Sequence, residues 1–264
     1  RGLCPRNSFV GGRLGKGGDA PLRVNRAMVL SEEVDKARFV RAMFTRIAHR
    51  YDLMNGLMTF GRHQAWRRAT ARLAAPRPGG LVLDVATGTG DLALALLEVA
   101  RVRRVLGVDF SEGMLAVGQR KLRGSGFAER VNLVASDALC LPFPDRTFDG
   151  VTSAFLLRNL ADLRQGLAEM RRVAKPGGTV VALEIAQPTL PGFKRLFSWY
   201  FHALVPRIGG IVSGDRDAYT YLPWSVDRFV SPDELGRLME SVGLRRVSYR
   251  RLGLGSVTIH AGTA

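Results

Sequence analysis

Residues 81–91 read LVLDVATGTGD, a short apolar run that carries Asp84 near its end and then turns through Gly88 and Gly90. A segment typical of a helix, DLALALLEVA, begins at the last of these residues. A strand, a glycine turn and a helix start in this order bring the backbone of an α/β protein close to a nucleotide-like ligand. Glycine matters at the turn because a residue without Cβ can adopt a positive φ and lets a ligand lie against the main chain. These residues therefore predict a nucleotide-binding α/β core.

From this point onward, segments typical of strands and helices alternate along the chain. Five apolar strands are predicted, at residues 81–86, 104–109, 131–135, 148–155 and 179–185. Their alternation with helices predicts a parallel sheet covered on both faces. Two last strands, at 245–251 and 256–261, are separated only by a short glycine-rich connection, which requires them to pair antiparallel. We therefore predict a Rossmann-like α/β fold with a seven-stranded mixed sheet that ends in an antiparallel hairpin.

The remaining chain is assigned by composition. Residues 1–27 are glycine-rich and basic without apolar periodicity, and we predict a disordered basic extension. Residues 28–264 are predicted to form one domain. Within it, residues 28–75 form a helical cap, and residues 76–264 form the core with an insertion at 190–230.

Two apolar segments leave alternatives open. In the cap, residues 51–60 read YDLMNGLMTF and lie between predicted helices at 31–49 and 66–73. This segment either packs on the core, where Met is a common gap filler, or forms a mobile apolar wall over a pocket. In the insertion, the basic and aromatic helix predicted within 193–212 is either buried or lies on a membrane surface.

The net charge of +16 is the most unusual bulk property of the chain. It fits a nucleic-acid partner, an anionic membrane surface or a general arginine bias. No zinc-finger or RNA-recognition signature accompanies the charge, so we expect no nucleic-acid partner. The four histidines are far apart and no Cys/His spacing suggests zinc, so we expect no metal. No apolar run approaches the ~18–20 residues of a membrane span.

Two nucleotide-like cofactors compete for the glycine turn. The spacing Gly88-x-Gly90-x-x-Ala93 satisfies a dinucleotide fingerprint, and Asp109 follows Gly88 by 21 residues, where a ribose-binding acid is expected. Two other features favour S-adenosylmethionine. Asp137, just after the third strand, is suitably placed to accept a hydrogen bond from an adenine amino group. The turn KPGG at 175–178 and the antiparallel finish are not needed by a nicotinamide enzyme, so we predict S-adenosylmethionine.

Over residues 40–262 the chain resembles the UbiE/MenG family of quinone-biosynthesis C-methyltransferases, a branch of the seven-strand class I methyltransferase superfamily. The RYDLMN and LRN blocks are far more specific to this family than the glycine turn. The segments that carry the resemblance are FTRIAHRYDLMNGLMTFGRHQAWRR, LDVATGTGDLA, GVDFSEGML, DALCLPFPDRTFDGVT, FLLRN, RRVAKPGG, YTYLPWSVDRF and SVTIHAG.

The resemblance implies a set of cofactor contacts and also shows two departures. With the two glycines of the turn included, the predicted cofactor-binding residues are Gly88, Thr89, Gly90, Asp109, Asp137 and Ala138. Within the turn, we expect Thr89 to point at the amino-acid end of the cofactor. Ala154 stands where the family often has a small polar residue, and Leu156 stands where it usually has Gly. We expect the added leucine side chain to reshape the substrate entrance.

A candidate for the chemistry follows the fourth strand. Methyl transfer from a sulfonium is an in-line displacement, so positioning of the acceptor carbon can supply much of the catalysis. A ring carbon becomes nucleophilic when the neighbouring phenol ionises, which at neutral pH costs roughly 4 kcal/mol for a pKa near 10. The catalytic candidates are Arg158, which would favour the ionised ring, and Asn159, which would orient the Arg158 side chain. Because Arg stays protonated, it is a poor base, and we expect an ordered water to accept the proton that the ring loses. The alternative for Arg158 is a surface ion pair.

The resemblance implies C-methylation of a polyprenyl quinol in menaquinone biosynthesis. Methylation of a methoxy-benzoquinol in ubiquinone biosynthesis is the alternative acceptor, and a non-catalytic scaffold that binds S-adenosylmethionine is the alternative of another class. Two alternatives stay open for Tyr51, Tyr221 and His260: they line the path of the isoprenoid tail, or they pack in the core. The expected location is the cytoplasm, with peripheral contact at the inner face of an anionic membrane, and a homodimer is a further expectation.

Overall fold

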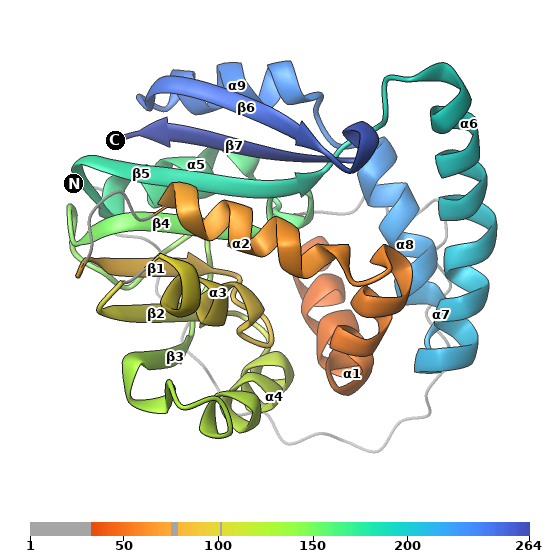
Figure 1. The fold of residues 1–264 in the computed structure, drawn as a ribbon, viewed down its shortest axis with the longest axis horizontal. Helices are drawn as coiled ribbons and strands as arrows, with labels where there is room; N and C mark the ends of the chain where they lie inside the picture. Colours follow the sequence, from red (N-terminus) through yellow and green to blue (C-terminus); the bar gives the residue numbers. More distant parts are fainter. Residues whose placement is uncertain (1–32, 75–78, 101) are drawn as a thin grey trace.

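The computed structural model describes residues 33–74, 79–100 and 102–264, which fold around one seven-stranded sheet (Figure 1). The strands are β1 (Leu81–Val85), β2 (Arg104–Asp109), β3 (Val131–Ala135), β4 (Phe148–Ala154), β5 (Ala174–Ile185), β6 (Arg245–Leu252) and β7 (Val257–Thr263). The α-helices are α1 (Glu33–Thr59), α2 (Arg62–Ala74), α3 (Asp91–Val99), α4 (Glu112–Arg123), α5 (Leu163–Val173), α6 (Pro191–Trp199), α7 (Val205–Ser213), α8 (Arg216–Asp227) and α9 (Pro232–Ser241). The predicted disordered extension, residues 1–27, lies outside the described residues.

The sheet has the order β3-β2-β1-β4-β5-β7-β6. The first five strands pair in parallel, and β7 runs antiparallel between β5 and β6. The predicted mixed sheet with an antiparallel end is therefore confirmed. One boundary differs, because residues 175–178 lie inside β5 rather than in a turn before it. The pairing shifts there from Phe148 opposite Ala174 to Gly150 opposite Thr179, and Gly177 bends the strand with a φ of 77°.

Helices cover both faces of the sheet (Figure 1). Helices α2, α3 and α4 contribute to the apolar core on one face, where Leu96 packs with Val82 of β1. Helices α5 and α9 contribute Leu167 and Met239 to the core on the other face, together with Leu83 of β1. Neighbouring β1 residues thus enter opposite cores, because successive strand side chains point to opposite faces.

Helix α1 continues without a break through the block that follows His49, so the predicted separation of residues 51–60 from the first cap helix is wrong. Met54 is fully buried, whereas Leu53 and Leu57 are 50% and 46% exposed. Apolar residues therefore lie on both sides of the helix, and this weakens the one-sided pattern by which an amphipathic helix is recognised. The helix ends just before Phe60 and Gly61, which adopt φ values of 51° and 73°.

The insertion forms α6, α7 and α8 beside α1 (Figure 1). A π-helical turn, Tyr200–Leu204, joins α6 to α7. Phe201 and Val205 are buried in a third apolar cluster that also contains residues of α1 and α8. In contrast, Leu196 and Trp199 of α6 are 58% and 59% exposed. The segment at 193–212 is thus buried in its second half, while α6 leaves apolar area in contact with solvent.

Candidate active site

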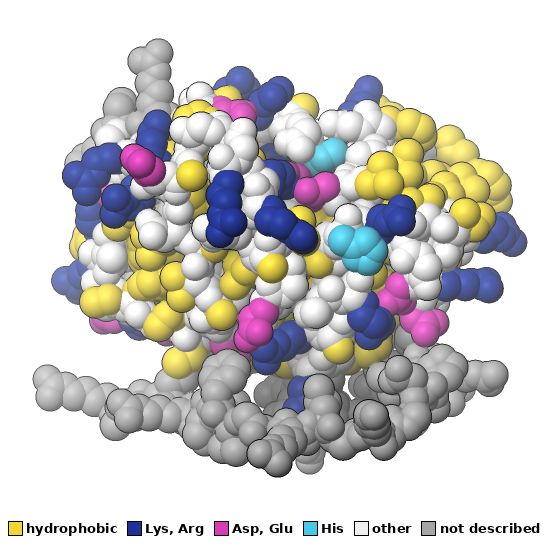
Figure 2. All heavy atoms as spheres, turned by 90° about the horizontal axis from the view of Figure 1, so that it is seen from below, with side chains coloured by type: hydrophobic (Ala, Val, Ile, Leu, Met, Phe, Trp, Pro, Cys, Tyr) yellow, Lys and Arg dark blue, Asp and Glu magenta, His cyan; other side chains and the backbone are white. Residues whose placement is uncertain are grey.

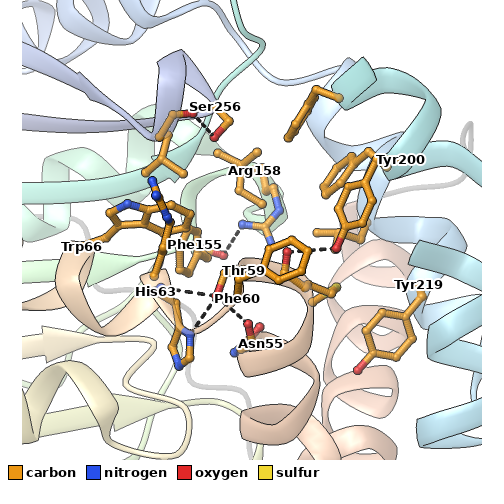
Figure 3. Close-up of a pocket in the computed structure, with 18 of the residues that line it drawn as sticks. Asn55, Thr59, Phe60, His63, Trp66, Phe155, Arg158, Tyr200, Tyr219 and Ser256 are labelled. Carbon is orange, nitrogen blue, oxygen red and sulfur yellow. Dashed lines mark hydrogen bonds between the residues drawn. The ribbon is translucent and has the colours of Figure 1, made fainter. Parts of the chain in front are cut away.

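Two cavities adjoin beyond the carboxyl ends of the parallel strands. The smaller, of about 90 Å³, lies at the ends of β1, β2 and β4 and is bordered by α1, and we call it the strand-end cavity. The larger, of about 490 Å³, lies among α1, the start of α2, α6 and α8, and we call it the helix cavity (Figure 3). Four residues line both cavities and form a shared wall: Phe44, Tyr51, Phe155 and Asn159.

The glycine turn forms one side of the strand-end cavity. The backbone N–H of Thr87 donates to the carbonyl of Val108 at 2.9 Å, which ties the turn to the end of β2. Gly88 lines the cavity with a φ of 58°. A Cβ at Gly88 would lie 3.3 Å from Cε of Met114, which lines the same cavity. The absence of a side chain therefore keeps backbone exposed to a ligand at this point.

Asp109 ends β2 with a buried carboxylate that faces the same cavity. Its Oδ2 accepts a hydrogen bond from Gly88 N at 2.9 Å, and its Oδ1 accepts one from Ser111 N at 2.8 Å. Burial raises the pKa of Asp109 to about 6, against the opposing effect of these backbone donors. Each carboxylate oxygen has a second lone pair, so the group can also accept hydrogen bonds from two vicinal hydroxyls.

The loop after β3 completes this cavity with Asp137 and Ala138. Asp137 is exposed, and its Oδ1 accepts a hydrogen bond from Leu139 N at 2.8 Å, which fixes the side chain at the cavity edge. The structure thus brings Gly88, Asp109, Asp137 and Ala138 together around one cavity, as the sequence predicts.

Thr89 and Gly90 do not line either cavity. The Thr89 hydroxyl donates to Asp52 Oδ1 of α1 at 2.6 Å and accepts from Lys121 Nζ of α4 at 3.1 Å. The expectation that Thr89 points at the cofactor is therefore not met in this structure. Gly90 instead caps the start of α3 with a φ of 83°.

Arg158 lies in a short 3₁₀ turn, Leu157–Asn159, and its side chain lines the helix cavity (Figure 3). The side chain is 6% exposed, so the alternative of a surface ion pair is wrong. Its Nη1 donates to the carbonyl of Phe155 at 2.7 Å and to Glu184 Oε2 at 3.2 Å. Among the residues that the structure describes, Nη1 alone of this guanidinium has hydrogen-bond partners, and Nε is buried without one. Nη2 also has no partner among the described residues and is not fully buried, so it is the donor within reach of a ligand.

Glu184 is the partner that sequence reasoning missed. It is fully buried in β5, and its Oε1 accepts a hydrogen bond from Leu157 N at 2.5 Å. Burial raises the pKa of Glu184, and the Arg158 charge opposes that shift. A signal was present, since an acid inside the apolar strand VVALEIA is rarely buried without a charged partner.

Asn159 is held from both sides at the shared wall. Its Nδ2 donates to the Phe155 carbonyl at 3.1 Å, and its Oδ1 accepts from the Tyr221 hydroxyl at 3.3 Å. No hydrogen bond joins Asn159 to the Arg158 side chain among the described residues, so any orienting effect passes through the common acceptor, Phe155. Burial raises the pKa of Tyr221 to about 12, although Arg158 opposes the shift, so the hydroxyl stays protonated at neutral pH.

Apart from Arg158 and Asn159, the helix cavity is mainly apolar and aromatic. Figure 3 shows Phe60, Trp66 and Tyr200 around Arg158. Tyr51 and Tyr221 line the cavity, and Tyr221 is also buried in the third apolar cluster. His260 does not line it. This residue is buried in β7, where its Nε2 donates to the carbonyl of Pro232 at 2.9 Å, so of the two alternatives it takes core packing.

The rim of the helix cavity is formed by exposed apolar side chains from separate parts of the chain. They are Phe60, Leu196, Trp199 and Leu254, and we call them the apolar rim. Within residues 33–74, 79–100 and 102–264, no helix is long and apolar enough to cross a membrane. The same residues contain no group of three or more His, Cys, Asp or Glu side chains that could hold a metal ion.

Comparison with known proteins identifies the family. The model of the ubiE/COQ5 methyltransferase family matches residues 31–264. The chain belongs to this family. It is 46% identical over 242 residues to the "Ubiquinone/menaquinone biosynthesis C-methyltransferase UbiE" of Geobacter sulfurreducens, covering 90% of this chain and 93% of that one. It is 45% identical over 235 residues to the "Demethylmenaquinone methyltransferase" of Roseiflexus castenholzii, covering 89% and 97% of the two chains.

Solved structures support the fold. A possible histamine N-methyltransferase of Thermotoga maritima, described as S-adenosylmethionine-dependent, has a TM-score of 0.59 and 18% identity, covering 84% of this chain and 98% of that one. The putative methyltransferase in complex with the Trm112 activator of Haloferax volcanii has a TM-score of 0.60 and 18% identity, with 84% and 97% covered. The Rossmann-like methyltransferase fold predicted from the sequence is thereby confirmed.

The family makes this protein a methyltransferase whose cofactor is S-adenosylmethionine. The strand-end cavity fits that group, because a buried acid with free lone pairs, a second acid and a glycine without Cβ face it together. The two departures from the family pattern, Ala154 and Leu156, also line this cavity. Leu156 does not line the helix cavity, so its predicted effect on the substrate entrance stays a prediction.

We expect the affinity for S-adenosylmethionine to fall as the pH is lowered through about 6, the raised pKa of Asp109. Ribose hydroxyls donate to the ionised carboxylate, so binding of the cofactor lowers the pKa of Asp109. At a pH below that pKa, Asp109 must first lose a proton before the cofactor can bind. The limiting slope is about tenfold per pH unit. Calorimetric titration across this range measures it.

The matched control is Asp109→Asn, which keeps the shape and one acceptor. We expect weaker binding without this pH dependence. Asp84, whose pKa burial raises to about 7, does not line the cavity and remains in the variant. An unchanged slope in Asp109→Asn would assign the pH effect to another group.

Proposed function

We propose that the protein transfers a methyl group from S-adenosylmethionine to a ring carbon of a polyprenyl-tailed quinol, with the naphthoquinol of menaquinone biosynthesis as acceptor. The observation that carries this proposal is the pair of cavities with a shared wall. One cavity presents acids and bare backbone suited to a nucleoside. The other is apolar and aromatic with one buried guanidinium, which suits a ring that develops negative charge. The names of the two curated relatives support the acceptor class.

In this proposal the strand-end cavity holds the cofactor. Asp109 accepts hydrogen bonds from the ribose hydroxyls, Asp137 accepts one from the adenine amino group, and Gly88 and Ala138 provide contact surface. Bound S-adenosylmethionine supplies an electrophilic methyl group on a sulfonium. The shared wall then determines where that group meets the acceptor, because Phe155 and Asn159 border both cavities.

Arg158 stabilises the ionised ring of the acceptor. Its guanidinium keeps its charge at any physiological pH and therefore favours the quinolate without acting as a base. The buried setting strengthens its electric field, because little water screens it. After the methyl group joins the ring carbon, the proton on that carbon leaves to water. Glu184 holds the guanidinium in place, and Asn159 and Tyr221 hold the wall beside it.

The isoprenoid tail leaves the helix cavity over the apolar rim in this proposal. Figure 2 shows hydrophobic side chains gathered at the right-hand edge of the molecule, the side on which α6 and α7 lie in Figure 1, with Lys and Arg beside them. Lys194 and Arg195 of α6 are exposed next to Leu196. Exposed apolar residues beside cations are typical of a surface that rests on an anionic membrane, which supports a peripheral location at the inner face.

The direct test of this function is turnover with two acceptors. We expect the full-length protein to methylate a tailed demethylnaphthoquinol faster than a tailed methoxy-benzoquinol, measured by mass spectrometry of the extracted product under reducing conditions. Preference for the benzoquinol would assign the protein to ubiquinone biosynthesis. Binding of S-adenosylmethionine without turnover of either acceptor would favour the alternative function, a non-catalytic scaffold.

We expect Arg158→Ala to lower kcat by roughly 10²–10³, the usual effect of removing one donor to a developing anion, with affinity for S-adenosylmethionine nearly unchanged. Because the single change leaves Glu184 buried without its partner, Arg158→Met combined with Glu184→Gln is the matched variant that removes both charges. If this double variant keeps full turnover, Arg158 has no electrostatic role in the reaction. If cofactor affinity collapses instead, the residue belongs to the other cavity.

We expect the protein to float with anionic vesicles and not with zwitterionic ones, and high salt to weaken this association. Leu196→Ser combined with Trp199→Ser should abolish flotation, because both side chains belong to the apolar rim. Leu73→Ser is the control, since Leu73 is exposed on α2 and lines neither cavity. Absence of flotation with either vesicle would contradict the membrane proposal.

A further inference from the structure

A group of charged and polar side chains joins the cap to the glycine turn without lining either cavity. We call it the turn cluster, and it comprises Asp52 of α1, Arg67 of α2, Thr89 of the turn, Asp91 of α3 and Lys121 of α4. The five residues come from five different segments. Neither the nucleoside contacts nor the chemistry proposed above uses them.

Lys121 is the centre of this cluster. Its Nζ lies 2.6 Å from Asp52 Oδ2, 2.5 Å from Asp91 Oδ1 and 3.1 Å from Thr89 Oγ1. An ammonium has three donors, so these contacts use all of them. Thr89 Oγ1 in turn donates to the other oxygen of Asp52 at 2.6 Å. The three side chains Asp52, Thr89 and Lys121 therefore form a closed ring of hydrogen bonds.

Asp91 anchors this ring to the core. Its side chain is 9% exposed, and its Oδ2 lies 3.5 Å from Nη1 of Arg67, whose side chain is 5% exposed. Burial by itself raises the pKa of Asp91, but Arg67 and Lys121 together hold it below its usual value. The carboxylate is therefore ionised at neutral pH and holds Lys121 on the side of α3 that carries the turn.

Two of the three residues that Lys121 contacts each adjoin a residue of the strand-end cavity. Asp52 follows Tyr51, which belongs to the shared wall, and Thr89 follows Gly88, which lines the same cavity. Along α1, Ala37, Val40 and Phe44 line the same cavity. The distance between α1 and the glycine turn sets the width of a space of only about 90 Å³. A small shift at Asp52 or Thr89 would therefore change the fit of any ligand between them.

We propose that Lys121 is a positioning residue that fixes the glycine turn against α1 and thereby sets the affinity for S-adenosylmethionine. This inference rests on the proposed cofactor site in the strand-end cavity. Without the ammonium, Asp52 and Asp91 repel each other, the Thr89 hydroxyl loses one partner, and α1 separates from the turn. The cap then no longer closes the cofactor cavity, although the sheet and its two cores are untouched.

A second ion pair joins the same two helices and serves as the control. Arg41 Nη2 of α1 lies 3.3 Å from Glu112 Oε1 of α4, and both side chains are exposed. Neither residue lines a cavity. Glu112→Gln therefore removes an α1–α4 pair without touching the glycine turn, so it separates a general loosening of the cap from the specific role of Lys121.

The experiment is a calorimetric titration of S-adenosylmethionine into the full chain and four variants, with thermal midpoints recorded in parallel. We expect Lys121→Met to weaken binding roughly tenfold, equivalent to about 1.4 kcal/mol. Lys121→Arg should recover part of the loss because it restores charge and donors. Asp52→Asn should weaken binding in the same direction, and Glu112→Gln should leave it within about twofold. In Lys121→Met, the backbone amides of α1 should exchange hydrogen faster. The thermal midpoint of unfolding should stay unchanged.

Two results would overturn the positioning role: folded Lys121→Met and Asp52→Asn that both bind like the parent protein, or an equal loss in Glu112→Gln. Asp52→Asn keeps the test decisive if Lys121→Met does not fold. Asp137→Ala, measured beside them, tests the cofactor site itself. If Asp137→Ala binds normally, the proposed site is wrong; if it binds weakly while the Lys121 variants bind normally, only the positioning role fails.

Discussion

Both cavities depend on the backbone of Phe155, the first residue after β4. It adopts a φ of 60°, which costs a non-glycine residue about 1–3 kcal/mol and persists only where the surroundings enforce it. Its N–H donates to the Leu183 carbonyl at 2.7 Å, and its own carbonyl accepts from Arg158 and Asn159. This one carbonyl therefore orients the Arg158 guanidinium and the Asn159 amide. Phe155 itself borders both cavities.

The buried ion pair beside Phe155 explains how a charge is kept in an apolar cavity. An isolated guanidinium or carboxylate loses several kcal/mol of hydration on burial, so neither Arg158 nor Glu184 is tolerable alone. Their contact, with Leu157 N on the second carboxylate oxygen, compensates that loss. The pair is formally neutral, but the guanidinium lines the helix cavity and the acid does not. The positive member of the pair therefore faces the space in which we propose that the acceptor ring binds.

Sequence reasoning succeeds where topology determines the outcome. Gly88, Asp109 and Asp137 meet because the carboxyl ends of parallel strands lie at one edge of a sheet, so finding the strands locates the residues after them. It fails where a side chain's direction depends on a remote partner. Thr89 faces Asp52, 37 positions earlier, and not the cavity. Glu184 of β5 pairs with Arg158 of the 3₁₀ turn, 26 positions earlier. Local pattern contains neither pairing.

Helix α1 also explains why the cap belongs to the catalytic unit rather than to a separate accessory part. Phe44 and Tyr51 border both cavities, so the same helix lines the proposed cofactor space and the proposed acceptor space. In-line transfer requires the two reactants at contact distance and aligned, and their closure away from water strengthens the electrostatic interactions between them. A cap seated on only one cavity would leave the other open at the shared wall. The long, continuous α1 therefore couples the two enclosures, which a helix that ended before Tyr51 could not do.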